Sequence, residues 1–165
     1  MQIARRLLLL EVAFAVICYQ FWRTTLRFLD RLQPLGLLAL RIVLGIIMIA
    51  HGYPKVFGGL SEHVHHVSNL GLPGWLAYCS AAAEFFGGIL LLAGLFTRIA
   101  ALAILINMSV AIWKVHWKNG LLGNGGYQFP LSLAAIAFAL ILLGAGPIAL
   151  DSIRRPSRGV KAKKA

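Results

Sequence analysis

Long apolar runs constrain the fold of this chain more than any other feature. Such runs cover residues 35–53, 75–94, 98–116 and 128–146, and each approaches the roughly 20 residues that a helix needs to cross a bilayer. They lack the period-2 alternation of a membrane β-strand, and helices satisfy every backbone amide within their own segment. Only 13% of the residues are charged, against about 25% in a soluble domain. The sequence therefore predicts an all-α, integral membrane four-helix bundle.

The N-terminal segment, residues 1–33, has a different pattern. Arg23, Arg27 and Arg31 recur every four residues, which is typical of an amphipathic helix that lies in the membrane interface. A fifth crossing helix over the apolar residues 7–22 is the alternative. We accordingly expect three parts, namely an N-terminal amphipathic interfacial helix at 1–33, a four-helix domain at 34–152 and a basic cytoplasmic tail at 153–165.

The charge of the chain, +11, is explained by membrane topology. Lysine and arginine gather at the ends of the apolar runs and in the tail, as the positive-inside rule and attraction to anionic headgroups predict. Side A denotes the membrane side on which the first run begins, and side B the other. Ten cations are expected on side A, namely Arg23, Arg27, Arg31, Arg98, Arg154, Arg155, Arg158, Lys161, Lys163 and Lys164, against Lys55, Lys114 and Lys118 on side B. Both termini are therefore predicted to be cytoplasmic, and the partner is the lipid bilayer rather than nucleic acid.

One carboxylate, Glu84, stands in the middle of the second apolar run, roughly 14 Å from either end. Asn107 reaches a similar depth in the third run, and Arg41 in the first lies only about 5 Å nearer side A. Because a charge in lipid is costly unless it is paired, we expect Glu84 to pair with Arg41 beside Asn107. Gly87 and Gly88 should let another backbone approach closely. Two interpretations of Glu84 stay open, a functional group of the site and a purely structural group. In the structural interpretation it is a pin that fixes helix register or a carboxylic acid that is simply neutral.

A second polar cluster is expected where the helix ends meet at side B. Its members are His51, Lys55, Tyr78, Cys79, His116, Tyr127 and Gln128. Histidines with a lysine and a tyrosine at headgroup depth suit the carbonyl oxygens of a quinone or a proton relay. Polar residues that merely meet interfacial water are the alternative.

Metal and haem sites are less well supported. The stretch "HVHH" at residues 63–66 contains no i, i+4 histidine pair and has only Glu62 as a nearby carboxylate, so we assign no metal site. The chain has no CxxCH haem motif. Axial haem ligation by His51 and His116 is an open alternative of low specificity.

Several motifs together resemble the DoxX family over residues 35–152. They are Arg41, "HGYPKVFGG" (51–59), "GLP" (71–73), "AAAEFFGGILLLAGLFTRIAA" (81–101), "HWKNG" (116–120), "GGYQF" (125–129) and "LDS" (150–152). The resemblance implies a small four-helix bacterial membrane protein linked to membrane redox chemistry. DoxD-type relatives are regarded as subunits of a thiosulfate:quinone oxidoreductase, and others are tied to oxidative-stress complexes.

Carried over position by position, the family pattern points to Arg41, His51, Lys55, Glu84, Arg98, His116, Asn119 and Tyr127. Gln128 departs from the pattern, since an acidic residue is expected after the Gly-Tyr pair, and this puts proton chemistry at that position in doubt. The basic N-terminal helix also exceeds the usual core of the family and could serve docking to a larger complex.

These observations lead to one set of expectations. The candidate catalytic residues are Glu84, Arg41, His51 and His116, and the candidate cofactor-binding residues are Lys55, Tyr78, Asn107, Asn119, Tyr127 and Gln128. The protein is expected to be a multi-pass subunit of the bacterial inner membrane that interacts with quinone or with a partner oxidoreductase complex. A non-catalytic anchor or assembly subunit of a larger complex is the alternative.

Overall fold

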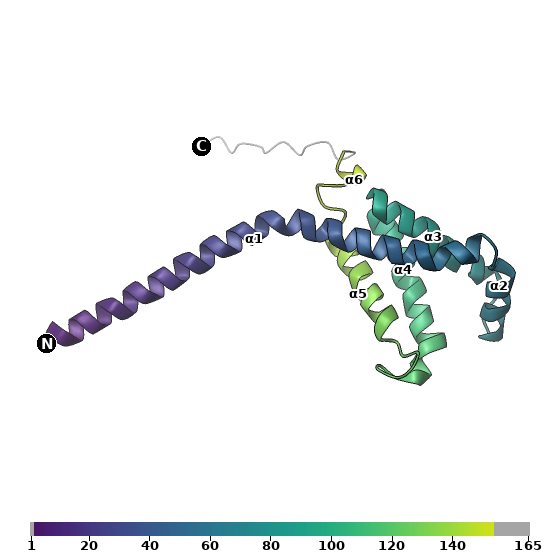
Figure 1. Cartoon of the computed structure of the whole chain (residues 1–165), viewed down its shortest axis with the longest axis horizontal. Helices are drawn as coiled ribbons and strands as arrows, with labels where there is room; N and C mark the ends of the chain where they lie inside the picture. Colours follow the sequence, from purple (N-terminus) through teal and green to yellow (C-terminus); the bar gives the residue numbers. More distant parts are fainter. Residues whose placement is uncertain (1, 154–165) are drawn as a thin grey trace, which may run out of the picture. The chain divides into compact units, whose positions relative to one another are not determined.

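The computed structural model describes residues 2–153, with side chains described for 19–22 and 29–153. This part of the chain is helical and contains no strand (Figure 1). The elements are α1 (Gln2–Val56), α2 (Leu60–Asn69), α3 (Trp75–Ala93), α4 (Thr97–Ala111), the π-helix η1 (Ile112–His116), the 3₁₀-helix η2 (Trp117–Asn119), α5 (Gln128–Leu143) and α6 (Leu150–Ile153). The predicted all-α class is confirmed. The chain divides into two units between Gly36 and Leu37.

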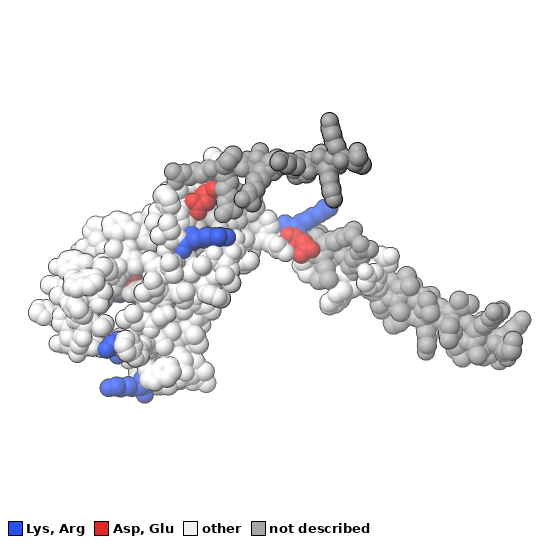
Figure 2. Space-filling model, turned by 180° about the vertical axis from the view of Figure 1, so that it is seen from behind, with Lys and Arg blue, Asp and Glu red and all other residues white. Residues whose placement is uncertain are grey.

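Within the described part of the chain, three helical stretches are long and apolar enough to cross a membrane, Leu29–Val56, Trp75–Ala93 and Thr97–Asn119. The fourth apolar helix, α5, has only 16 residues, which is shorter than the roughly 20 that span a bilayer. It ends at Leu143 rather than at the predicted 146, because Gly144 takes a left-handed φ of 80°. The face of the second unit in Figure 2 is mostly uncharged, as expected of a surface in contact with lipid.

Helix α1 extends beyond the first apolar run in both directions. Residues 2–33 and the first apolar run belong to one helix, α1, which also continues past Pro54 to Val56. The first apolar run, residues 35–53, stops just before Pro54 and predicts a helix that ends there. A proline removes a single backbone donor, and here it lies within the last turn, where little helix remains to be disrupted. The interfacial position of residues 1–33 stays a prediction.

Close backbone contact fixes the register of α1 against α3. A Cβ atom added to Gly88 would lie 2.8 Å from the carbonyl oxygen of Gly45, and one added to Gly52 would lie 2.5 Å from the backbone nitrogen of Phe85. Small residues allow such an approach between helices in a membrane. The expected role of Gly88 is confirmed, whereas a Cβ on Gly87 would make ordinary contacts at 3.5 Å with Ile104. The two helices therefore pack antiparallel, backbone to backbone.

A core of aliphatic side chains joins α1 and α3 to α4 and α5. Leu44, Leu91, Ile104 and Leu140, one from each helix, are fully buried. These large side chains pack around the small buried residues Ala101 and Ala137 on α4 and α5. Polar side chains lie beyond this core, toward the side-B ends of the helices.

The side-A end of the second unit is held by Arg41 and Asp151. Arg41 is 2% exposed, and its guanidinium donates to the carbonyl oxygens of Ala145 at 2.6 Å and Ile148 at 2.7 Å. The Asp151 carboxylate accepts hydrogen bonds from the backbone N–H groups of Phe96 and Thr97 at 2.9 Å, which caps the start of α4. The segment after α5 is thus fastened to α1 and to the α3–α4 turn.

Candidate functional site

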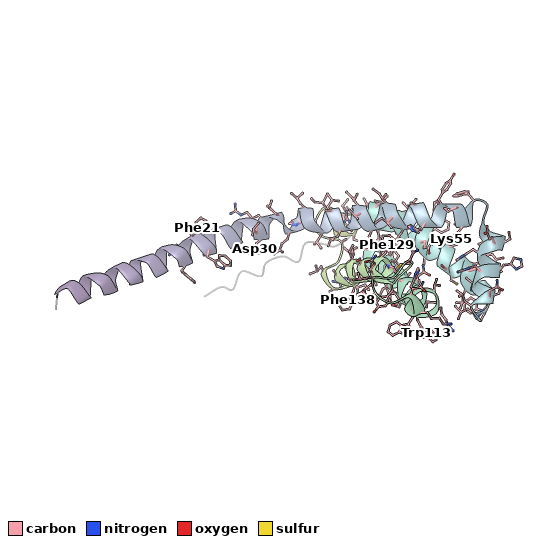
Figure 3. All side chains as sticks on the ribbon, turned by 60° about the horizontal axis from the view of Figure 1, so that its bottom comes forward. Phe21, Asp30, Lys55, Trp113, Phe129 and Phe138 are labelled. Atoms are coloured by element: carbon pink, nitrogen blue, oxygen red, sulfur yellow. The ribbon has the colours of Figure 1, made fainter. Side chains whose placement is uncertain are left out.

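Glu84 finds its cationic partner at the side-B end of α1. The Nζ atom of Lys55 lies 2.6 Å from both carboxylate oxygens of Glu84, and the side-chain amide of Asn107 donates to Oε1 at 3.0 Å. Glu84 is 4% exposed. The expected meeting of Glu84 with Asn107 is confirmed, and Figure 3 labels Lys55 near the end of α1. Lysine, carboxylate and amide therefore join α1, α3 and α4 at one point.

The predicted pair between Glu84 and Arg41 is wrong. Arg41 lies beside Gly94, where a Cβ atom would stand 2.6 Å from its Nη1. Gly94, the residue that follows α3, comes ten residues after Glu84, which corresponds to about 15 Å along a helix axis. That separation exceeds the reach of the arginine side chain, so Arg41 bonds to backbone carbonyls at side A instead.

The ion pair between Lys55 and Glu84 leaves hydrogen-bond donors of Lys55 and Asn107 unused. An ammonium group has three N–H donors, and two of those of Lys55 are directed at Glu84. No other partner of Lys55 occurs among the described residues, and its side chain is 26% exposed. Asn107 also keeps one amide N–H that Glu84 does not use. Both groups can therefore bind a ligand without breaking the pair.

These groups line a cavity of about 810 Å³ at the side-B end of the second unit. Most of its wall is apolar, with Met48, Val67, Ile106 and Leu133 among the lining side chains. Its polar lining residues are His51, Lys55, His63, His66, Cys79, Ser80, Glu84, Asn107, Lys114, His116 and Gln128. An apolar cavity of this size with a few convergent polar groups is typical of a small-molecule site.

The cavity brings together six of the ten predicted site residues. These are Glu84, His51, His116, Lys55, Asn107 and Gln128. The lining does not include Arg41, Tyr78, Asn119 or Tyr127. Tyr78 is exposed, Tyr127 stacks on Trp117 with ring centroids 5.6 Å apart, and Asn119 donates to the carbonyl oxygen of Gly125 at 3.1 Å. Asn119 and Tyr127 thus hold the loop before α5 in place.

His51 and His116 present the same tautomer to the cavity. The Nδ1 atom of His51 lies 2.9 Å from the carbonyl oxygen of Ile47, and that of His116 lies 2.6 Å from the carbonyl oxygen of Gly125. A carbonyl only accepts, so Nδ1 must carry the proton in each ring. In the neutral form Nε2 then has a free lone pair, which can accept a hydrogen bond or a proton from a ligand.

The helix that carries His116 changes its winding next to the cavity. After α4 ends at Ala111, residues Ile112–His116 form the π-helix η1, a local widening that is often found at functional sites. Lys114 and His116 of η1 both line the cavity. The Nζ atom of Lys114 lies 4.4 Å from the ring centroid of Trp113, which Figure 3 labels.

His63 and His66 on α2 are cavity residues that the sequence analysis missed. They were considered only as metal ligands, and the described residues contain no group of three His, Cys, Asp or Glu side chains arranged to hold a metal. A usable signal was present, because His63 lies four residues before the buried Val67 and seven before Leu70, on the inward face of α2. That face covers the cavity.

Burial lowers the pKa of His63 below its ordinary value of 6.5, and the nearby charge of Lys55 lowers the pKa further. The Nε2 atom of His63 is buried and has no hydrogen-bond partner in the described part of the chain. Below pH 6.5 the unfolded chain therefore binds a proton at this residue that the folded chain resists. The free energy of unfolding should decrease as the pH falls from about 6.5 toward the lowered pKa of the folded state.

We expect His63→Gln to flatten this pH dependence. Thermal unfolding of the detergent-solubilised protein, followed between about pH 5 and pH 7, would measure the effect. The matched control is His65→Gln, because His65 is exposed on the same helix and should leave the slope unchanged. Equal slopes in wild type and His63→Gln would contradict the assignment.

Comparisons with known proteins cover most of the chain. A sequence model of the DoxX family matches residues 36–117. The Bacillus subtilis protein named "Putative oxidoreductase CatD" is 37% identical over 117 residues, which are 71% of this chain and 85% of that protein. The Escherichia coli protein named "Inner membrane protein YphA" is 31% identical over 137 residues, or 77% of this chain and 97% of that protein. No solved structure matches.

Proposed function

The chain belongs to the DoxX family of membrane proteins, and we propose that it binds a quinone in the side-B cavity and exchanges protons with it, while a partner oxidoreductase exchanges the electrons. One observation carries this proposal. A mostly apolar cavity of about 810 Å³ has a part-buried lysine–glutamate pair and two histidines in its wall. The names of two relatives, "Putative oxidoreductase CatD" and "Inner membrane protein YphA", support a redox role at the inner membrane. The protein accordingly resides in the bacterial inner membrane.

The chemistry of a quinone matches the groups around the cavity. Its ring is apolar and its two carbonyl oxygens need hydrogen-bond donors, which the unused N–H groups of Lys55 and Asn107 supply. Reduction of one quinone to its quinol takes up two electrons and two protons. His51 and His116 are placed to give and accept protons through Nε2. The electrons come from a redox partner, because proton transfer alone leaves the oxidation state unchanged.

The predicted membrane topology determines which half of the membrane the cavity faces. With both termini cytoplasmic, as the positive-inside rule predicts, the cavity faces the periplasmic half of the membrane. A lipophilic quinone would then enter from the bilayer, and the histidines would connect it to water on that side.

A non-catalytic anchor or assembly subunit is the second candidate. The favouring observation is that Glu84 binds both Lys55 and Asn107, so that one carboxylate ties together three helices. In that role the cavity would hold no redox ligand, and the buried pair would serve only to specify the packing of the bundle.

Filling the cavity tests quinone binding directly. Ala83 lines the cavity, whereas the neighbouring Ala82 is exposed and does not line it. We expect Ala83→Phe to weaken the binding of a naphthoquinone to the full chain in nanodiscs at least about tenfold, which corresponds to roughly 1.4 kcal/mol. Quenching of tryptophan fluorescence would measure the affinity.

Ala82→Phe is the control and should bind as the wild type does, because its ring would point toward lipid. Equal affinity of wild type and Ala83→Phe would place the quinone elsewhere. A wild-type protein that binds no quinone would favour the anchor.

A further inference from the structure

The cavity carries an excess of positive charge. Glu84 is the one carboxylate among the described residues that line it, and both of its oxygens already bond to Lys55. Lys114 lines the same cavity and has no carboxylate facing it there. One full positive charge is therefore left without a partner in the cavity wall, in addition to the four histidines, which can add to this charge but not offset it.

Lys114 lines the cavity, whereas the Trp113 ring beside its ammonium does not. Its Nζ lies over the Trp113 ring, 4.4 Å from the centroid, and a cation so placed is stabilised by the ring without being neutralised. Trp113 is exposed and Lys114 is half-buried, so water only partly screens the ammonium. A ligand anion in an apolar cavity interacts more strongly with such a charge than it would in water.

Lys55 adds a directed donor to the same space. Its third N–H has no partner in the described residues, and a charge-assisted bond from an ammonium to an anionic oxygen is roughly twice as strong as a neutral one. A ligand oxygen with negative charge is therefore favoured over a neutral carbonyl, both by the net charge of the wall and by its hydrogen-bonding capacity.

From this arrangement we infer that the cavity selects an acidic hydroxyquinone, bound as its anion, over a neutral quinone of the same shape. The inference rests on the proposed quinone-binding function and specifies its substrate class. In the bound state the ionised hydroxyl is compensated by Lys114 and accepts a hydrogen bond from Lys55. The apolar wall, including Met48 and Leu133, contacts the rings.

Two naphthoquinone probes of nearly equal shape separate the effect of ligand charge from the effect of ligand shape. One is 2-hydroxynaphthoquinone, which is ionised at neutral pH, and the other is its 2-methoxy counterpart, which is neutral. With the full chain in nanodiscs of zwitterionic lipid, we expect the hydroxy compound to bind about tenfold more tightly, a difference of roughly 1.4 kcal/mol. The preference should shrink in high salt, which screens a partly exposed charge.

Two lysine variants test which residue causes the preference for the hydroxy compound. Lys114→Gln should reduce it at least about threefold, which is within the range of one partly exposed charge. Lys118→Gln is the control, because Lys118 is exposed and does not line the cavity, and it should keep the preference.

Equal binding of the two probes, or a preference that Lys114→Gln retains in full, would overturn the inference while leaving quinone binding intact. Failure of both probes to bind would overturn the proposed function as well.

Discussion

Replacing Lys55 by methionine is expected to destabilise the protein by about 3 kcal/mol, because it leaves the carboxylate of Glu84 buried without a cation. Methionine keeps the length and apolar contacts of the lysine stem, so the lost charge dominates the effect. Glu84 is 4% exposed, so water would solvate its unpaired carboxylate poorly. Thermal unfolding in detergent, or unfolding by denaturant, would measure the change.

Removing the charge of the other partner, Glu84, should destabilise the protein much less. In Glu84→Gln the amide still accepts from Asn107, and the freed ammonium of Lys55, whose side chain is 26% exposed, can turn toward water. The double variant Lys55→Met/Glu84→Gln should recover most of the stability lost in Lys55→Met alone. Additive losses in the double variant would show that the two residues do not act as a pair.

The helices were largely predictable because their pattern is strong. The apolar run at residues 75–94 predicts the bounds of α3 closely, and the helix ends before Gly94, which has a left-handed φ of 66°. The weaker predictions lay at the ends of helices. The short α5 ends at Leu143, before Gly144. Helix α1 continues through Pro34 and Pro54, since the cost of a proline depends on which carbonyl loses its donor.

The partner of Glu84 was missed because depth was counted from the ends of the apolar runs. That procedure assumes that all spans begin and end at the same level. The real register is set by the contacts of Gly45 with Gly88 and of Gly52 with Phe85. In an antiparallel pair with this register, Lys55 comes opposite Glu84, whereas Arg41 comes opposite Gly94. Glycines that could face each other were visible in the sequence, but which ones pair is a tertiary property.

The cavity itself was predicted only in part. The polar ends of the apolar runs indicated that His51, Lys55 and His116 would gather at side B, and the structure brings them to one cavity. The contribution of α2 to the cavity wall depends on how the chain after α1 folds back over the bundle. The contribution of Lys114 to this wall depends on the π-helical winding of η1. The spacing of His63, Val67 and Leu70 indicates which face of α2 is buried, but it does not show which part of the bundle that face covers.

Replacing Arg41 by methionine should be the second large loss of stability, again about 3 kcal/mol, since two charge-assisted hydrogen bonds to backbone carbonyls disappear. Ala145 and Ile148 would lose the donor that binds their carbonyl oxygens at 2.6 and 2.7 Å. The segment after α5 also carries Asp151, whose carboxylate caps α4. If this segment is released in Arg41→Met, the Asp151 cap at the start of α4 should weaken as well, in addition to the loss of the Arg41 hydrogen bonds.

Hydrogen exchange distinguishes this local effect from a general loss of stability. In Arg41→Met, the amides of Asp151 and of Thr97, which donate to Gly94 and to Asp151, should exchange faster, while those of α2 should be unchanged. Arg41→Lys should recover part of the stability, because a single ammonium cannot match the planar fork that binds both carbonyls. Arg98→Met is the control, since Arg98 is exposed and donates one bond of 3.2 Å to Leu142; a loss as large as that of Arg41→Met would contradict the role given to Arg41.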